Sequence, residues 1–221
     1  MATREQFLQH VRNALVEGRK AGHASPLPQR GRVGYQGAGA DPATKFIEMA
    51  AAMGAFPTRV SSMENARDAI VALVQTKQAR RVVLSDDPIL KELGLIRALR
   101  EIDCDAFTLT PKTPRDAVFA ADLGITGVSG LIAETGSLVM AAAPSQPRSA
   151  SLLPPIHVAV ARAEQILPDL FDVLAPYSDA RVPPSCLTLI TGPSKTGDIE
   201  LKLVTGVHGP GEVHVIVIGA L

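Results

Sequence analysis

Near the N-terminus, apolar residues recur every three or four positions, which is the spacing of one face of a helix. The residues of this stripe are Phe7, Leu8, Val11, Leu15 and Val16. They predict a helix over residues 4–18 that has one apolar face. Thr3 and Gln6 stand three positions apart, as in a capping box, and are expected to cap the first turn.

A segment rich in glycine and proline follows this helix. These residues recur every few positions over 21–41, too densely for a core element, and such a composition is typical of a linker. We therefore expect residues 1–43 to form an N-terminal helical arm with its linker. Residues 44–221 are expected to form one domain.

Beyond the linker, segments with helical periodicity alternate with short apolar runs that are typical of buried strands. The helices are expected over 44–53, 61–79, 89–101, 113–121 and 166–174. The strands are expected over 55–60, 81–85, 106–110, 158–161, 187–190 and 213–218, with two further apolar runs around a glycine-rich turn in 123–140. This alternation predicts an α/β fold with about seven strands, in which helices cover both faces of a mostly parallel sheet.

Charge and hydropathy exclude several classes of protein. Lys and Arg number 22, as do Asp and Glu, so the formal net charge is zero. A protein that binds nucleic acid or an anionic membrane needs a basic excess to displace counterions, so we expect neither partner. The chain has neither the run of about 18 apolar residues that spans a membrane nor an apolar N-terminal leader. A cytoplasmic location is the expectation.

The common cofactor motifs are missing. Cys104 and Cys186 are the only cysteines, too few for the four thiolates that usually hold an iron–sulfur cluster. No zinc-ligand spacing and no GxGxxG turn after an early strand is present. We therefore expect no metal site, and the motifs name no cofactor.

Ligands of open parallel sheets bind beyond the carboxyl ends of the strands, so loops that follow strands are the first candidates. The first such loop is Glu134-Thr135-Gly136-Ser137, a carboxylate and two hydroxyls in a small-residue turn. Thr135, Gly136 and Ser137 are candidate substrate- or anion-binding residues. Apolar walls on both sides would raise the pKa of Glu134 and make it a proton-transfer group or a nucleophile. The alternative is a hairpin turn whose carboxylate accepts backbone hydrogen bonds.

The second loop follows the strand expected over 187–190. Its candidate substrate- or anion-binding residues are Gly192, Ser194, Lys195, Thr196, Asp198 and Glu200. The spacing of a phosphate-binding P-loop is missing, yet backbone N–H groups and the Lys195 ammonium can hold an anion. Asp198 and Glu200 would repel a phosphate, and a plain polar loop with Asp198 as a helix cap is the alternative.

The third loop, Gly206 to Gly211, places His208 between glycines just before the last strand. A histidine in a fixed, exposed loop can act as a general base or bind an anion, although a structural hydrogen bond is the commoner role. His157 and His214 lie in or beside expected strands, where a buried and hydrogen-bonded side chain is the simpler interpretation.

Four segments together resemble the lactate-utilisation (LUD) domain family. They are Gly130–Ser137, Pro154–Val158, Gly192–Glu200 and Gly206–Pro210, within a match over about 44–218. GPSKTGDIE and GVHGP are the specific part, and Gly197 stands where the family usually has Ala. The size of the chain and its few cysteines resemble the short members of the family, not the longer iron–sulfur members.

The resemblance implies a fold like that of glucosamine-6-phosphate deaminase, ribose-5-phosphate isomerase and coenzyme A transferases. It also implies an accessory or substrate-handling role in the oxidation of L-lactate to pyruvate, with iron–sulfur subunits of a lactate oxidase complex as partners and a small organic acid as ligand. Glu134-Thr135-Gly136 resembles the turn that carries the nucleophilic Glu of coenzyme A transferases.

Two other hypotheses stay open at this point. The first is an independent enzyme, related to coenzyme A transferases or folate cyclo-ligases, that uses Glu134 and His208 on a small acyl or phosphorylated substrate. The second is a scaffold whose glycine-rich loops are only structural. A homo-oligomer is compatible with each.

Overall fold

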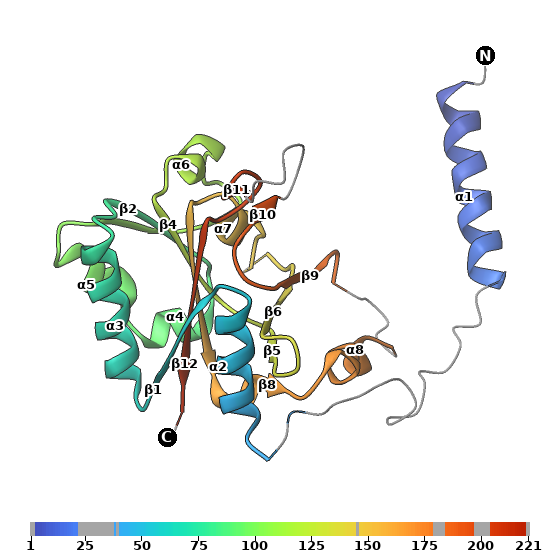
Figure 1. Ribbon diagram of the computed structural model, residues 1–221. Helices are drawn as coiled ribbons and strands as arrows, with labels where there is room; N and C mark the ends of the chain where they lie inside the picture. Colours follow the sequence, from blue (N-terminus) through green and yellow to red (C-terminus); the bar gives the residue numbers. More distant parts are fainter. Residues whose placement is uncertain are drawn as a thin grey trace. The chain divides into compact units, whose positions relative to one another are not determined.

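The computed structural model describes residues 3–21, 38, 40–144, 146–178, 184–196 and 204–219 (Figure 1). The chain divides into two compact units, Met1–Tyr35 and Gln36–Leu221, and each is described by itself. None of the helices in these ranges combines the length and the apolarity that a membrane crossing requires.

The first unit contains α1 (Arg4–Ala21), which extends the helix predicted over 4–18 by three residues. Its capping box is formed as expected. The Thr3 N–H donates to Gln6 Oε1 (2.9 Å), and the Gln6 N–H donates to Thr3 Oγ1 (3.3 Å). The apolar stripe faces solvent, and Phe7 and Leu15 are more than half exposed.

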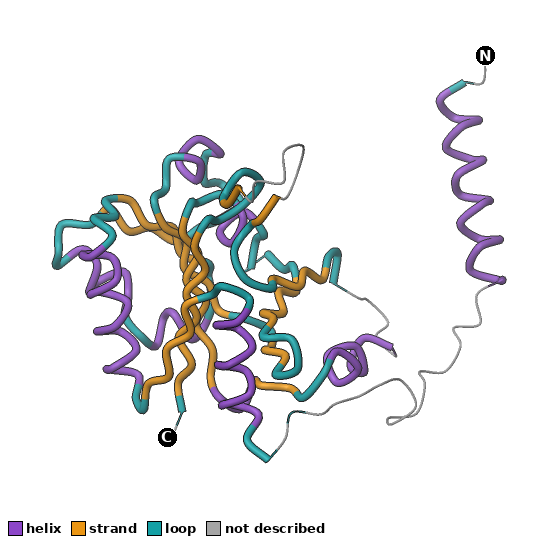
Figure 2. The backbone as a smooth tube through the Cα atoms, in the orientation of Figure 1, coloured by secondary structure: helices purple, strands orange, loops and turns teal. Residues whose placement is uncertain are grey.

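The second unit is built on a six-stranded sheet in which every neighbouring pair is parallel (Figures 1 and 2). In spatial order the strands are β1 (Phe56–Val60), β12 (Glu212–Ile218), β7 (Ile156–Arg162), β4 (Leu123–Gly127), β2 (Arg81–Leu84) and β3 (Asp105–Thr108). β4 lies in the segment 123–140, where two apolar runs were expected, and each of the other five strands lies within two residues of a strand expected from the sequence. The predicted α/β fold with a mostly parallel sheet is therefore confirmed.

Alternate residues of the central strands face two separate cores, because side chains alternate along a strand. Val158 and Val160 of β7 pack in the core that includes Ile70 of helix α3 (Met63–Thr76). Ala159 and Ala161 of β7 pack in the other core, with Phe46 of helix α2 (Pro42–Ala52). A strand that is buried on both faces is a continuous apolar run, and this explains why these strands are recognisable from the sequence.

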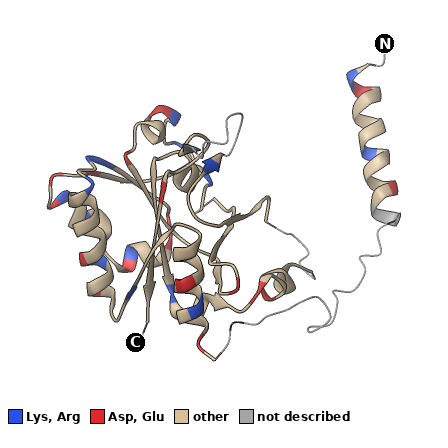
Figure 3. Ribbon diagram, viewed as in Figure 1, with Lys and Arg blue, Asp and Glu red and all other residues tan. Residues whose placement is uncertain are grey.

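Helices α3 (Met63–Thr76), α4 (Pro88–Glu92) and α5 (Leu95–Arg100) cover one face of the sheet (Figure 1). The sequence predicted one helix over 89–101. Two helices form instead, because Gly94 adopts a left-handed conformation (φ +65°) and is the N-cap of α5. Acidic and basic residues both occur along α3, whereas α5 contains Arg97 and Arg100 and no acidic residue (Figure 3).

The other face is covered by α2 (Pro42–Ala52) and by a second sheet that the sequence did not predict. The strands of this sheet are, in order, β8 (Ile166–Leu167), β5 (Gly130–Ile132), β6 (Ser137–Ala141) and β9 (Leu187–Ile190). The β5, β6 and β9 strands pair antiparallel. The strand expected over 187–190 is thus present, but it pairs in this small sheet and not in the parallel one.

Short elements complete the unit. They are α6 (Arg115–Phe119), α7 (Ser149–Leu152), the 3-10 helix η1 (Ala163–Gln165), α8 (Leu170–Ser178), and the two-residue strands β10 (Lys195–Thr196) and β11 (Val204–Thr205). The helix predicted over 166–174 begins at Leu170, because residues 166–167 pair with β5 as strand β8.

Candidate functional site

The loop that carries Glu134 is the tight turn between β5 and β6. The Gly136 N–H donates to the Ile132 carbonyl (2.9 Å), and Gly136 has a positive φ of +65°. A Cβ on Gly136 would lie 2.2 Å from the Ala50 amide nitrogen, well inside van der Waals contact. The turn therefore needs glycine for its conformation and also for its close approach to α2.

The loop that follows β9 approaches the same helix. Gly192 has a φ of +76°, and a Cβ there would lie 2.3 Å from the Met53 carbonyl oxygen, at the C-terminus of α2. Three hydroxyls join this loop to the first. Thr135 Oγ1 and Ser137 Oγ lie 2.7 Å apart, and Ser137 Oγ lies 2.7 Å from Thr191 Oγ1. The two loops thus converge on the end of α2.

The Lys195 ammonium has a defined partner in the structure. It donates to the Met53 carbonyl (2.8 Å), one of the carbonyls that the end of α2 leaves without an intrahelical partner. A cation at a helix C-terminus is stabilised by the helix dipole. Lys195 therefore caps α2, a role that the sequence did not predict, and an ammonium has two further donors for a ligand.

We predict that Lys195→Met lowers the unfolding free energy by about 0.5–1 kcal/mol, because a helix cap and a favourable charge–dipole interaction are lost. The melting temperature should fall by roughly 1–4 °C for a domain of this size. Lys112→Met, which changes an exposed lysine, is the control. Equal melting temperatures for the two variants in a thermal melt would contradict the capping role.

The third loop packs against the second. The Ser194 N–H donates to the Pro210 carbonyl (2.9 Å), and the Gly206 N–H donates to the Ser194 carbonyl (3.0 Å). His208 is exposed. We refer to the three joined loops, residues 134–137, 191–196 and 206–211, as the glycine-loop cluster.

The glycine-loop cluster lies at the amino ends of the parallel strands, whereas the sequence predicted a site at their carboxyl ends. The Gly211 N–H donates to the carbonyl of Pro155, and these residues immediately precede β12 and β7. Gly54 precedes β1 by two residues, and a Cβ placed on it would lie 3.0 Å from Lys195 Nζ. The cluster therefore meets the amino ends of these strands. The expectation failed because β9, which supplies the second loop, is not a strand of the parallel sheet.

The structure brings some of the candidate residues together and not others. Asp198 and Glu200 lie outside the described residues. Glu134 is half-buried, and its N–H donates to the Pro168 carbonyl (3.1 Å). In the described part of the chain, no hydrogen bond or ion pair links the side chains of Glu134, Lys195 and His208. Thr196 pairs with Val204 in the β10–β11 hairpin. The loops are joined mainly by backbone contacts and hydroxyls.

The family model of the LUD domain matches residues 43–218, which is most of the chain. The chain belongs to the LUD domain family. The resemblance seen in the GPSKTGDIE and GVHGP segments is thereby confirmed.

Relatives of this LUD domain include two curated bacterial proteins. "Lactate utilization protein C" of Halalkalibacterium halodurans is 33% identical over 159 residues, which cover 69% of this chain and 67% of the relative. "Uncharacterized protein YkgG" of Escherichia coli is 33% identical over 172 residues, which cover 75% and 74%. A crystal structure of a DUF162 family protein from Deinococcus radiodurans superposes with a TM-score of 0.58 at 25% identity, covering 81% of this chain and 98% of that chain.

The histidines in the sheet of the LUD domain have the structural positions expected of them. His157 is fully buried in β7, and its Nε2 lies 2.9 Å from Thr126 Oγ1. Burial lowers the pKa of His157 to about 4. His214 stacks on Phe56, with ring centroids 4.8 Å apart, and its Nε2 lies 3.1 Å from Glu212 Oε2.

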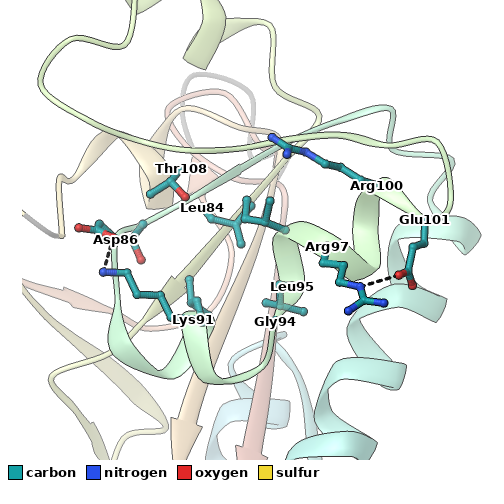
Figure 4. A pocket seen from close by; sticks show the side chains of 12 residues that line it. Leu84, Asp86, Lys91, Gly94, Leu95, Arg97, Arg100, Glu101 and Thr108 are labelled. Carbon is teal, nitrogen blue, oxygen red and sulfur yellow. Dashed lines mark hydrogen bonds and ion pairs between the residues drawn. The ribbon is translucent and has the colours of Figure 1, made fainter.

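The sequence analysis missed a cavity at the carboxyl ends of β2 and β3 of the LUD domain (Figure 4). Ser85 and Asp86, which follow β2, and Thr108, the last residue of β3, are among its lining residues. The rule that ligands bind after strands applies to these loops. The local signal of Asp86-Asp87-Pro88, however, is that of a helix start, and it gives no sign of a cavity. The helix does begin at Pro88, but the Asp87 side chain accepts from the Gln146 amide and caps nothing.

Proposed function

We propose that this chain takes part in lactate utilisation, as an accessory or substrate-handling subunit that works with iron–sulfur partner proteins. The observation that carries the proposal is the match to relatives named for lactate utilisation, which extends over two thirds of the H. halodurans protein. The match to the family model includes the whole glycine-loop cluster. A small organic acid is therefore the ligand that we propose for that cluster.

The proposed subunit role rests on the chemistry that this chain can supply. Oxidation of lactate to pyruvate releases two electrons, which an acceptor must take up. The chain has two cysteines, and an iron–sulfur cluster usually needs four thiolates, so we assign the electron acceptor to another chain. Cys104 and Cys186 are both free thiols, in keeping with a reducing compartment, and we propose the cytoplasm as the location.

Growth of the host on L-lactate tests the proposal. We expect that deletion of the gene abolishes growth on L-lactate as sole carbon source and leaves growth on pyruvate unchanged. We also expect the purified chain to show no turnover of L-lactate with an artificial electron acceptor. A tagged chain isolated from lactate-grown cells should carry iron and acid-labile sulfide with it. Normal growth of the deletion strain on L-lactate would overturn the proposal.

The alternative of an independent enzyme is favoured by one observation, the joining of the loops of Glu134, Lys195 and His208 into one cluster. It requires that the purified chain turn over a substrate by itself. We would assay acyl transfer from a coenzyme A thioester to a small carboxylic acid, and ATP-dependent cyclisation of a reduced folate. Turnover in either assay that disappears in Glu134→Gln would replace the subunit role with this function.

Under the subunit role, we predict that Glu134→Gln lowers lactate-dependent oxygen consumption of complemented cells by about tenfold or more, because a positioned carboxylate that transfers protons is lost. The melting temperature of the purified variant should stay near that of the wild type, since the Glu134 side chain is only half-buried. Glu48→Gln, which changes an exposed carboxylate on the adjacent α2, is the matched control. Equal respiration of the two variants would indicate that Glu134 is only part of a turn.

A further inference from the structure

The cavity beyond β2 and β3 occupies the place where parallel sheets bind ligands. Ligands of open α/β sheets bind outside the carboxyl ends of the strands. Ser85 and Asp86 follow β2, and Thr108 ends β3, so the lining of the cavity includes the carboxyl ends of both strands. The cavity has a volume of about 610 Å³ and lies between these strand ends and the helices α4 and α5.

One polar group in the wall of this cavity lacks a partner. Ser85 is 2% exposed and lines the cavity. Its hydroxyl has no hydrogen-bond partner among the residues that the structure describes. A buried hydroxyl without a partner is costly, so native structures keep few of them. The Ser85 hydroxyl is therefore a donor or acceptor that is free to meet a ligand.

The charged residues of the wall leave one cation in excess. Lys91 Nζ lies 2.7 Å from Asp86 Oδ1, and Arg97 Nε lies 2.9 Å from Glu101 Oε1 (Figure 4). The third cation, Arg100, forms no ion pair within the described ranges, and its guanidinium donates to the Ala106 carbonyl (3.2 Å). A guanidinium has five N–H donors, and this contact uses one of them.

The rest of the wall is mainly apolar. Leu84, Leu90 and Leu95 line the cavity, and all three are buried side chains of the adjacent core. Apolar walls with a few polar groups are typical of sites that enclose the body of an organic ligand and fix its orientation. The cation and the hydroxyl would hold the polar end of such a ligand, while the leucines contact its body.

The cavity is much larger than a three-carbon acid. Lactate has six non-hydrogen atoms, and even at roughly 30 Å³ per atom, the share of one liquid water, it would fill less than a third of the cavity. The cavity accommodates about 20 non-hydrogen atoms on the same basis. We therefore expect a ligand larger than the acid proposed for the glycine-loop cluster.

We propose that this cavity binds an organic anion that carries a carboxylate or phosphate group on a larger hydrocarbon or ring body. Arg100 pairs with the anionic group, and the Ser85 hydroxyl forms a hydrogen bond to the ligand. Leu84, Leu90 and Leu95 contact the ligand body. The inference does not rest on the proposed function, because it uses none of the residues of the glycine-loop cluster.

Calorimetric titration of the purified full chain tests this site with two probes. Decanoate presents a carboxylate on a hydrocarbon chain, and AMP presents a phosphate on a ring system. We expect one of them to bind with one site per chain, and which one binds distinguishes an acyl ligand from a nucleotide. L-lactate is titrated in parallel and is expected not to bind at this site.

Two variants decide whether the binding involves these residues. Arg100→Met should weaken binding by about tenfold or more, because a charge-assisted hydrogen bond is lost. Ser85→Ala should weaken it by roughly two- to tenfold. Ser85→Ala should also keep or raise the melting temperature, because it removes a buried hydroxyl that has no partner among the described residues. Arg115→Met, at an exposed arginine of α6, is the control and should bind as the wild type does.

Three results would overturn the proposal. The first is that neither decanoate nor AMP binds to the wild-type chain. The second is binding that Arg100→Met and Ser85→Ala leave unchanged relative to Arg115→Met. The third is L-lactate binding that depends on Arg100 as strongly as probe binding does, since the volume argument would then be wrong. None of these results bears on growth with L-lactate, so the proposed function stands or falls separately.

Discussion

Gly136→Ala is expected to lower the unfolding free energy by about 2–4 kcal/mol, a large part of the stability of an ordinary domain. Two costs add at this position. An alanine at a φ of +65° costs about 1 kcal/mol in backbone strain. Its Cβ would also lie 2.2 Å from the Ala50 nitrogen, so the turn and α2 must move apart, at about 1–3 kcal/mol.

Gly94→Ala separates these two costs. Gly94 has the same φ of +65°, but a Cβ there meets no atom within 4 Å. We expect Gly94→Ala to lower the unfolding free energy by only about 1 kcal/mol. Urea or thermal unfolding of both variants measures the difference, and the Gly136 variant should melt roughly 4–16 °C below the wild type. Equal losses in the two variants would mean that the contact between the turn and α2 is not tight.

The second large effect is a loss of stability in acid that arises from His157. Burial lowers the pKa of this histidine to about 4 in the folded chain, against 6.5 for the free side chain. The unfolded state therefore takes up a proton at a higher pH than the folded state. The resulting loss begins as the pH falls through 6.5 and is complete below about 4, where it amounts to about 3 kcal/mol.

His157→Gln tests this prediction, because glutamine does not titrate. The unfolding free energy of wild type and variant is measured by urea denaturation at several pH values between about 7 and 4.5. We expect the wild type to lose about 2.5 kcal/mol more than the variant over this interval, whatever the variant costs at neutral pH. His214→Gln is the comparison. Burial lowers the pKa of His214 as well, but His214 is only partly buried, so its removal should change the pH dependence less. Parallel pH profiles for wild type and His157→Gln would contradict the prediction.

Much of the fold could be predicted from local sequence. The strands of the parallel sheet are apolar on both faces, so each is a short run such as Val213–Ile218 that a local window detects. The capping box at Thr3 and Gln6 is equally local, and both of its hydrogen bonds are formed. The family resemblance could be recognised in segments such as Gly206–Pro210, which lie within the residues that the family model matches.

The strand pairing of the small sheet could not be predicted from local sequence. An apolar run indicates that a strand is buried, but it does not indicate which strand pairs with it. Residues 187–190 were correctly predicted as a strand, yet their partner is β6, which precedes them by about fifty residues along the chain. Residues 166–167 share the helical periodicity of residues 170–174, and their pairing with β5 overrides it.

The candidate site also has one part that the sequence predicts and another that only the tertiary structure decides. The sequence determined the three glycine-rich loops, because turns with positive φ select glycine at positions such as Gly136 and Gly192. Only the tertiary structure decided that these loops meet on the end of α2, at the amino ends of the parallel strands. That arrangement depends on contacts between residues far apart in the chain, such as Ser137 with Thr191, 54 positions later, and Lys195 with Met53, 142 positions earlier. The cavity beside Ser85 and Arg100 was likewise decided by packing, because an unpaired hydroxyl and an excess cation are properties of neighbours in space and not of neighbours in sequence.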